Sequence, residues 1–399
     1  MKENVSIVDK RGECSGCSAC YNACPYEAIE MILSKEGFYV PEVNKDLCKD
    51  CGICLQICPV TNKFNYPQFD HPKTYVAWSL DETKRLSSSS GGIYPEIARF
   101  VLEQSGKVFA VGWGKNWLPE HIEVSGIEEI SKTVGSKYAQ SYVGKVYKRI
   151  VDLLRKEKDV LFVGTPCQVA GLKNILLKSV EKQKLNGILT VDLVCHGVAS
   201  PMVFRKYLTE RFGINNITSI SFRDKKYGWS KFSFKITMAD GILYSKHHLK
   251  DPFFYGFLVD LYLNRICYEC PFSTLPRQGD ITLGDFWGVP EKYKDERGVS
   301  VILVNSEKGM SVLNELLKKK RIFAEEVPLE WATKNNPRII TGQMKVPEKR
   351  EEILKNIHTK NWKYIERKYI KPPTGMRGLI RNGINLFKRI LKKTLKIKR

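Results

Sequence analysis

The 399-residue chain lacks several features that would place it in a common class of protein. No stretch reaches the roughly 18 uninterrupted apolar residues that a membrane-spanning helix needs. Met1–Lys10 carries four charged residues and no apolar core, so it does not resemble a secretory signal. Zinc-finger, RNP and helix-turn-helix signatures are also missing, so we expect no nucleic-acid partner. We therefore expect a cytoplasmic protein whose thiols stay reduced.

Acidic residues are scarce beside 65 Lys and Arg: the chain has 43 Asp and Glu and a formal net charge of +22. Between Met376 and Arg399 there are nine Lys or Arg and no acid. Apolar residues recur in this tail at helical spacing: Ile380, Ile384, Phe387, Leu391 and Leu395. Such a basic amphipathic helix is typical of peripheral association with an anionic membrane surface, here the inner face of the plasma membrane. A helix docked on a partner, or a disordered or RNA-touching tail, is the alternative.

Cysteine, by contrast, is plentiful, and eight of the twelve cysteines form two copies of one pattern. Each copy reads Cys-x-x-Cys-x-x-Cys-x-x-x-Cys-Pro, the bacterial ferredoxin spacing, in which the fourth cysteine ligates the other cluster. A zinc site would use two CxxC pairs or a mixture with His. We therefore predict two [4Fe-4S] clusters. Their ligand sets are Cys14, Cys17, Cys20 and Cys58 for one, and Cys48, Cys51, Cys54 and Cys24 for the other.

Beyond residue 63 the sequence alternates between short apolar runs and helical periodicity. Residues 159–164 and 187–194 read as buried strands, each followed by a helix, which is typical of a parallel α/β arrangement. Residues 217–244 alternate with a period of two around Ala239-Asp240-Gly241, which predicts an antiparallel insertion. The expected fold is an α+β ferredoxin-like dicluster domain followed by an α/β domain with a mixed, largely parallel sheet. The predicted boundaries are 1–63 for the ferredoxin domain, 64–74 for a linker, 75–340 for the oxidoreductase domain, 341–375 for a helical extension and 376–399 for the basic tail.

Four further cysteines lie in distinctive settings. Cys167 follows one predicted strand, Cys195 follows the next, and Cys267 and Cys270 form a CxxC followed by Pro. The carboxyl ends of neighbouring parallel strands share one edge of a sheet, where open α/β folds place their sites. A CxxC brought to that edge would complete the ligands of a third [4Fe-4S] cluster. A zinc site, a redox disulfide at the CxxC, buried inert thiols, or a nucleophile–base pair of Cys195 with His196 are the alternatives.

Two loops rich in Gly and Ser are candidates for binding a phosphorylated cofactor. Residues 87–92 read Ser-Ser-Ser-Ser-Gly-Gly between a predicted strand and a predicted helix, so hydroxyls, N–H groups and a helix N-terminus converge there. Residues 135–138 read Gly-Ser-Lys-Tyr and add a cation and an aromatic ring. A flavin nucleotide suits this chemistry, and flavins couple one-electron carriers to hydride transfer. A flexible polar turn with an N-cap Ser is the alternative for 87–92.

Taken in order, these segments resemble a known family. The dicluster repeat is followed by Ser-Gly-Gly at 90–92, Gly-Ser-Lys-Tyr at 135–138, Gly-Thr-Pro-Cys-Gln at 164–168, Cys-His-Gly at 195–197, the CxxC at 267–270 and Gly-Asp-Phe-Trp-Gly at 284–288. The series, from Cys14 to about Arg338, resembles the beta subunit of coenzyme F-420-reducing hydrogenases and dehydrogenases. The resemblance implies FAD passing electrons between iron-sulfur clusters and a deazaflavin, with the third cluster near the flavin. The candidate flavin contacts are Ser90, Gly91, Gly92, Gly135, Ser136, Lys137, Tyr138 and Thr165.

The chain also departs from that family. It carries its own ferredoxin unit, whereas hydrogenase beta subunits can rely on partner chains, and it ends in the basic tail. The expected function is an iron-sulfur flavoprotein oxidoreductase that exchanges electrons with a redox protein such as a ferredoxin. Its small-molecule acceptor or donor is the deazaflavin F-420 or another compound, including a glycan precursor, and no catalytic side chain is identified. An electron-transfer subunit without a substrate site is the alternative.

Overall fold

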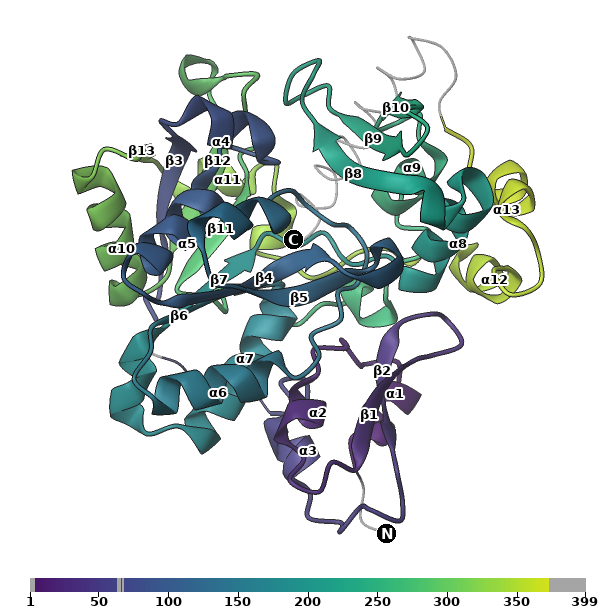
Figure 1. The fold of residues 1–399 in the computed structure, drawn as a ribbon, viewed down its shortest axis with the longest axis horizontal. Coiled ribbons are helices and arrows are strands. Elements are labelled where there is room, and N and C mark those ends of the chain that lie inside the picture. The colour runs from purple at the N-terminus through teal and green to yellow at the C-terminus, as the bar shows by residue number, and fades with distance from the viewer. Residues whose placement is uncertain (1–3, 63–65, 67, 373–399) are drawn as a thin grey trace, which may run out of the picture.

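The computed structural model describes residues 4–62, 66 and 68–372. The N-terminal domain is a small α+β unit at the bottom of Figure 1, built around an antiparallel hairpin that pairs Met31 with Pro41. Each Cys-x-x-Cys-x-x-Cys run leads into a helix of five residues. The elements are α1 (Ser6–Lys10), α2 (Ala19–Ala23), β1 (Ile29–Leu33), β2 (Tyr39–Val43) and α3 (Ile53–Ile57).

The larger domain is organised by an eight-stranded mixed sheet with the order β13-β3-β12-β11-β7-β6-β4-β5. Parallel pairing is confined to β4, β6, β7 and β11, and all other neighbours are antiparallel. The sheet is therefore mixed as predicted but less parallel than the sequence indicated, because short apolar runs do not encode strand direction. The strands are β3 (Lys73–Ser79), β4 (Lys107–Trp113), β5 (Pro119–Val124), β6 (Val160–Gly164), β7 (Ile188–Leu193), β11 (Ile281–Asp285), β12 (Ser300–Val304) and β13 (Ile322–Glu326).

Helices cover both faces of this sheet. Buried residues of α5 and α10 pack on one face together with Leu161 and Val163. Residues of α6 and α7 pack on the other face with Val160 and Phe162, as the alternation of side chains along β6 requires. The N-terminal domain lies against this second helical layer (Figure 1). The covering helices are α4 (Glu82–Ser87), α5 (Ile93–Glu103), α6 (Val146–Arg155), α7 (Pro166–Ser179), α10 (Glu307–Lys318) and α11 (Leu329–Thr333).

The predicted antiparallel insertion forms a separate three-stranded sheet with the order β10-β9-β8. Its aromatic core includes Phe222, Phe234 and Phe253 and is closed by the two last described helices, α12 and α13. These two helices lie within the predicted helical extension. The elements are α8 (Pro201–Phe212), β8 (Ile217–Asp224), β9 (Ser233–Met238), β10 (Leu243–His247), α9 (Pro252–Leu258), α12 (Arg350–Asn356) and α13 (Trp362–Tyr369).

Short 3-10 turns connect several of these elements. They span Lys115–Trp117, Ile127–Lys132, Lys182–Gly187, Ile214–Asn216, Arg265–Tyr268, Glu291–Tyr293 and Pro337–Ile339. Among the described helices, none combines the length and the apolar character needed to cross a bilayer. The basic tail over 376–399 lies outside the described residues, so its amphipathic helix stays a prediction from sequence.

Candidate metal and cofactor sites

The N-terminal domain gathers its eight cysteines around two hollows. The repeats cross, because Cys24 and Cys58 each follow a short helix that carries the chain to the other repeat. The groupings are those that the ferredoxin spacing predicts. The inner cysteine set is Cys14, Cys17, Cys20 and Cys58, and the outer cysteine set is Cys24, Cys48, Cys51 and Cys54.

The two sets differ in their exposure to solvent. The inner hollow is lined by apolar side chains such as Val5 and Met31, and burial raises the pKa of Cys14 and of Cys17 to about 12. Thiols in such a setting ionise only when a metal replaces the proton, so the chemistry of this donor set fits a thiolate-bound cluster. In the outer set Cys51 is exposed. The outer set therefore faces solvent, and the inner set faces the protein.

The third cysteine set is Cys167, Cys195, Cys267 and Cys270. Burial raises the pKa of Cys195 to about 11, with Cys270 acting in the same direction and the Arg338 guanidinium in the opposite one. Every pair among the four cysteines is close enough for one thiolate to raise the pKa of another. The structure thus gathers residues that lie more than a hundred positions apart in the chain.

The sheet accounts for this gathering. Cys167 lies in the first turn of α7 after β6, and Cys195 follows the neighbouring parallel strand β7. A 3-10 turn over Arg265–Tyr268 brings the CxxC to the same edge. Thr165 caps α7 and lies beside Cys167, with 3.2 Å between Oγ1 and Sγ. The predicted set therefore shares one edge of the sheet.

Other details bear on the alternatives for these cysteines. All twelve are free of disulfides. His196 Nε2 lies 2.7 Å from Asp260 Oδ1, so the imidazole turns to a carboxylate and not to Cys195. Within the described part of the chain, no three or more His, Cys, Asp or Glu side chains are arranged to hold a single metal ion.

Helix α7 joins the inner set to the third set. Gly171 lies one turn after Cys167, and a Cβ at this position would lie 3.0 Å from Cys17 Sγ. The Cys17 thiolate is in turn close enough to raise the pKa of Cys167, which burial already raises strongly. Val60, two residues after Cys58, packs in one apolar cluster with Cys167 and Cys270. Sequence reasoning missed Gly171 and Val60, because nothing local marks either residue.

The two Gly- and Ser-rich loops predicted to bind a cofactor also meet. The backbone N–H of Ser136 donates to Ser89 Oγ at 2.7 Å, and the N–H of Gly91 donates to Ser300 Oγ at 2.8 Å. Gly92 has a φ of +83° and precedes α5, so this position favours glycine. The Ser88 hydroxyl is buried and has no hydrogen-bond partner among the described residues. An orphaned buried donor in this loop fits a polar ligand.

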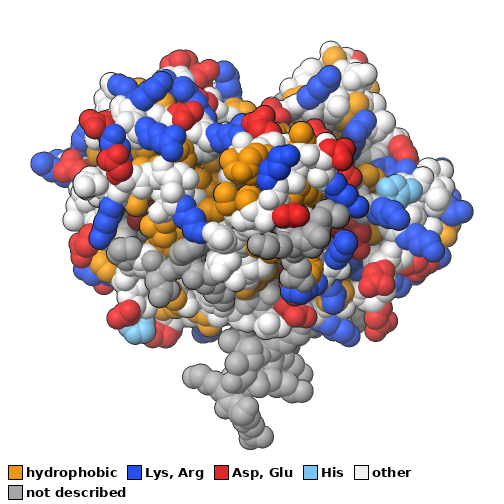
Figure 2. Space-filling model, turned by 90° about the horizontal axis from the view of Figure 1, so that it is seen from below, with side chains coloured by type: hydrophobic (Ala, Val, Ile, Leu, Met, Phe, Trp, Pro, Cys, Tyr) orange, Lys and Arg blue, Asp and Glu red, His pale blue; other side chains and the backbone are white. Residues whose placement is uncertain are grey.

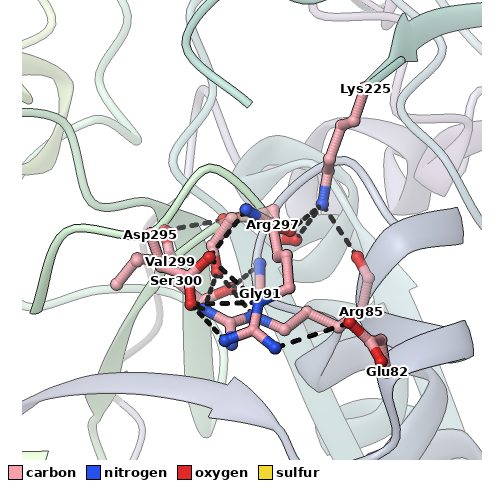
Figure 3. A network of polar contacts seen from close by, with 10 residues as sticks. Glu82, Arg85, Gly91, Lys225, Asp295, Arg297, Val299 and Ser300 are labelled. Atoms are coloured by element: carbon pink, nitrogen blue, oxygen red, sulfur yellow. Dashed lines mark hydrogen bonds and ion pairs between the residues drawn. The ribbon is translucent and has the colours of Figure 1, made fainter. Parts of the chain in front are cut away.

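Two buried lysines hold these loops, and the sequence predicted only one of them. Lys137 Nζ donates to the carbonyls of Thr133, Val134 and Gly135. Lys225 Nζ donates to those of Arg85, Ser90 and Arg297 at 2.6–2.8 Å (Figure 3). Burial lowers the pKa of each lysine to about 7. Lys225 lies on the chain after β8, far in sequence from both loops, which is why its role was missed.

An aromatic wall connects these loops to the third set. Arg223 donates to the Tyr138 hydroxyl at 3.1 Å and forms a two-point ion pair with Asp285 at 2.8 and 3.0 Å. The Tyr138 ring lies 4.9 Å from that of Phe257, which contacts His196 at 5.2 Å. Because His196 follows Cys195, the predicted flavin contacts and the third set share one neighbourhood.

Comparison with known families agrees with this arrangement. Residues 157–329 match the family model for the C terminus of the coenzyme F420 hydrogenase/dehydrogenase beta subunit, and residues 13–62 match the 4Fe-4S dicluster domain. The chain belongs to this family of beta subunits. The matched C-terminal segment contains all four cysteines of the third set, whereas the loops at 87–92 and 135–138 precede it. The chain thus joins a 4Fe-4S dicluster domain to an oxidoreductase-family domain.

Individual relatives extend the likeness along the chain. The F-type subunit of the F(420)H(2) dehydrogenase of Methanosarcina mazei is 24% identical over 346 residues, which cover 80% of this chain and 93% of the relative. The coenzyme F420-dependent sulfite reductase of Methanocaldococcus jannaschii is 24% identical over 341 residues, and the chain spans 48% of its length. A chain of the F420-reducing [NiFe] hydrogenase complex from Methanosarcina barkeri aligns with a TM-score of 0.48 and 15% identity, covering 84% of this chain and 94% of that one.

Proposed function

We propose that the protein is an iron-sulfur flavoprotein oxidoreductase with three [4Fe-4S] clusters and FAD, acting on a deazaflavin or another small acceptor. The observation that carries the proposal is the unbroken succession of sites: the outer set, the inner set, the third set across Gly171, and the Gly- and Ser-rich loops across the aromatic wall. When bound, the clusters supply one-electron chemistry and FAD supplies the conversion to hydride transfer. The remaining roles belong to the side chains.

The twelve cysteines would hold the clusters in their three sets. Thiols buried at the inner set favour a cofactor that displaces protons, and the crossed ligands Cys24 and Cys58 keep two cofactors together. The Cys17–Gly171 contact places the inner set directly against α7, whose first turn carries Cys167. This packing supports exchange between the N-terminal domain and the larger domain.

The outer set would face the redox partner, a ferredoxin or a similar protein. Tyr26, which lines the outer hollow, and Leu47, beside Cys48, are each 47% exposed. Figure 2 shows hydrophobic side chains gathered near the centre of the face seen from below, the side on which the N-terminal domain lies. An exposed apolar surface around a redox site is typical of a protein contact.

The Gly- and Ser-rich loops would hold the FAD pyrophosphate. Ser88 offers an unpaired hydroxyl, and Lys137 and Lys225 bring positive charge to the same loops. Burial disfavours the charge on both lysines, so an anionic ligand would be bound most tightly by their protonated forms. The Tyr138 and Phe257 rings offer a surface on which a flavin ring can stack.

One relative is named as a subunit, which favours a second candidate function. In this alternative the protein is an electron-transfer subunit of a larger redox complex and has no substrate site of its own. The two functions differ in the flavin: the first requires a flavin absorbance band in the purified or FAD-reconstituted protein, and the second does not.

Anaerobic purification followed by iron and sulfide analysis tests the proposal. About twelve irons per chain are expected, falling to about eight in Cys195→Ser, because each cubane holds four. About eight irons in the unchanged chain would reject the third cluster. FAD titration then tests the flavin, and reduction by dithionite or reduced ferredoxin followed by deazaflavin, nicotinamides and nucleotide sugars identifies the acceptor. Absence of FAD binding would reject the flavoenzyme in favour of the electron-transfer role.

A further inference from the structure

A buried arginine lies against the third cysteine set without being part of it. Arg338 is 7% exposed and uses all three guanidinium nitrogens on peptide carbonyls. Its Nε donates to Cys195 O at 3.1 Å, its Nη2 to Cys267 O at 3.1 Å and its Nη1 to Gly342 O at 2.7 Å. One side chain therefore ties together two cysteine-bearing segments that are distant in sequence.

The charge on Arg338 has no acidic partner among the residues that the structure describes. Its neighbour Arg277 shows the contrast, because that fully buried guanidinium pairs with Asp192 at 3.2 Å. Arg277 also donates to the carbonyl of Arg338, at 3.3 Å, and so fixes the backbone that carries the second cation. Burying an unpaired cation is unfavourable unless other negative charge compensates it. A four-iron cube with four thiolates is anionic and would supply that charge.

The chain after Arg338 is fitted closely to the CxxC. The N–H of Cys270 donates to Gly342 O at 3.1 Å, and the N–H of Met344 donates to Tyr268 O at 2.7 Å. A Cβ at Gly342 would lie 1.8 Å from the carbonyl oxygen of Cys270, so no other residue fits without displacing the backbone. The segment 338–344 therefore runs along the CxxC as a second backbone layer.

We propose that Arg338 is a positioning residue for the third iron-sulfur cluster: it fixes the peptides of Cys195 and Cys267, and its charge stabilises the reduced form. The proposal rests on the proposed function, which supplies the cluster. Arg338 lies beyond residues 157–329, the segment that matches the family of beta subunits. The motif thus contributes the ligands, and a residue outside it contributes the charge and the tether.

Three variants separate the two contributions. Arg338→Gln removes charge and tether, Arg338→Lys keeps a charge but loses the three-point fork, and Gly342→Ala keeps the guanidinium but moves the segment that it anchors. Arg350→Gln is the matched control, since Arg350 is 2% exposed and donates to a carbonyl, that of Leu263, but touches no candidate ligand. The measurements are iron per chain and potentiometric titration of each cluster by EPR, with the two N-terminal clusters as internal references.

Arg338→Gln is expected either to lower the iron content from about twelve to about eight, or to lower the reduced-to-oxidised ratio of the third cluster at fixed potential about tenfold, equivalent to about 59 mV. Arg338→Lys should shift the potential less than Arg338→Gln, and Gly342→Ala should lose iron with the least shift. Arg350→Gln should leave the third signal unchanged. If Arg338→Gln does not fold, a lower iron content or potential in Arg338→Lys supports the proposal.

Two failures are distinguishable. A third cluster missing from the unchanged chain, with no EPR signal that Cys195→Ser removes, would reject the proposed function and, with it, the role of Arg338. A third cluster present and unaltered in occupancy and potential in both Arg338 variants would overturn the role of Arg338 alone.

Discussion

The N-terminal cysteines and the third cysteine set reach the same kind of arrangement by opposite routes. The inner and outer sets come from two local repeats within residues 14–58, each turning through a five-residue helix. The third set comes from two neighbouring strand ends and a 3-10 turn that only a folded sheet brings together. Local sites depend on spacing and bound metal, whereas the third set depends on the stability of a large core. The two kinds of site should therefore respond differently to damage.

The largest expected effect breaks this contrast at the ligands. Cys58→Ser removes a ligand that crosses between the repeats, and a domain of about 60 residues with helices this short needs its metal to fold. We expect Cys58→Ser to lose both N-terminal clusters, leaving about four irons per chain, while Cys167→Ser leaves about eight. Iron analysis and circular dichroism measure this. Equal losses in the two variants would contradict it.

The second prediction concerns the contact between the two regions. Gly→Ala inside a helix normally stabilises a protein by about 1 kcal/mol, but at Gly171 the added methyl would meet Cys17 Sγ. We expect Gly171→Ala to destabilise the protein by about 1–3 kcal/mol in denaturant unfolding and to weaken the magnetic coupling between the inner and third clusters in EPR.

The control for Gly171 lies on the same helix. Leu177 is 40% exposed, so Leu177→Ala should change stability little and leave the coupling intact. A stabilising effect of Gly171→Ala would show that the N-terminal domain is not held against α7 as described.

The third prediction tests the buried lysines of the larger domain. Burial lowers the pKa of Lys225 to about 7, so in the free protein the lysine is charged below that pH and neutral above it. Because an anionic pyrophosphate favours the charged form, FAD affinity should fall as pH rises through 7, with a limit of about tenfold per pH unit. Lys225→Gln should weaken binding at pH 6 and reduce the slope, while exposed Lys231→Gln should do neither. Identical slopes in all three proteins would reject the role of Lys225.

The smallest effect is expected at the basic tail, 376–399, which lies outside the described residues. The sequence predicts that it adds binding to anionic membranes, at about 1 kcal/mol for each cation near the surface. Co-sedimentation of the intact chain with anionic vesicles should exceed that of a chain ending at Thr374. Equal binding by the two chains would remove the membrane from the account of this protein.

The sequence was most informative where a site is local. The two repeats predicted which cysteines would meet, including the crossed positions of Cys24 and Cys58, because ligand geometry fixes the spacing. Strand ends also predicted that Cys167 and Cys195 share an edge. Strand direction was less predictable, since the apolar runs at 300–304 and 160–164 look alike although one strand pairs antiparallel and the other parallel. The residues that support the sites, Gly171, Lys225 and Arg338, carry no local signal.

Sequence alone therefore determined the chemistry of this protein: sulfur ligands in three sets, two loops with hydroxyls and N–H groups, and a basic excess. Tertiary structure alone decided how these parts are connected. It placed the inner set against α7 and the outer set toward solvent, and it brought Arg338 to the third set and Lys225 to the loops. The physical reason is that ligand spacing is a short-range constraint along the chain, whereas close packing of distant segments depends on the whole core.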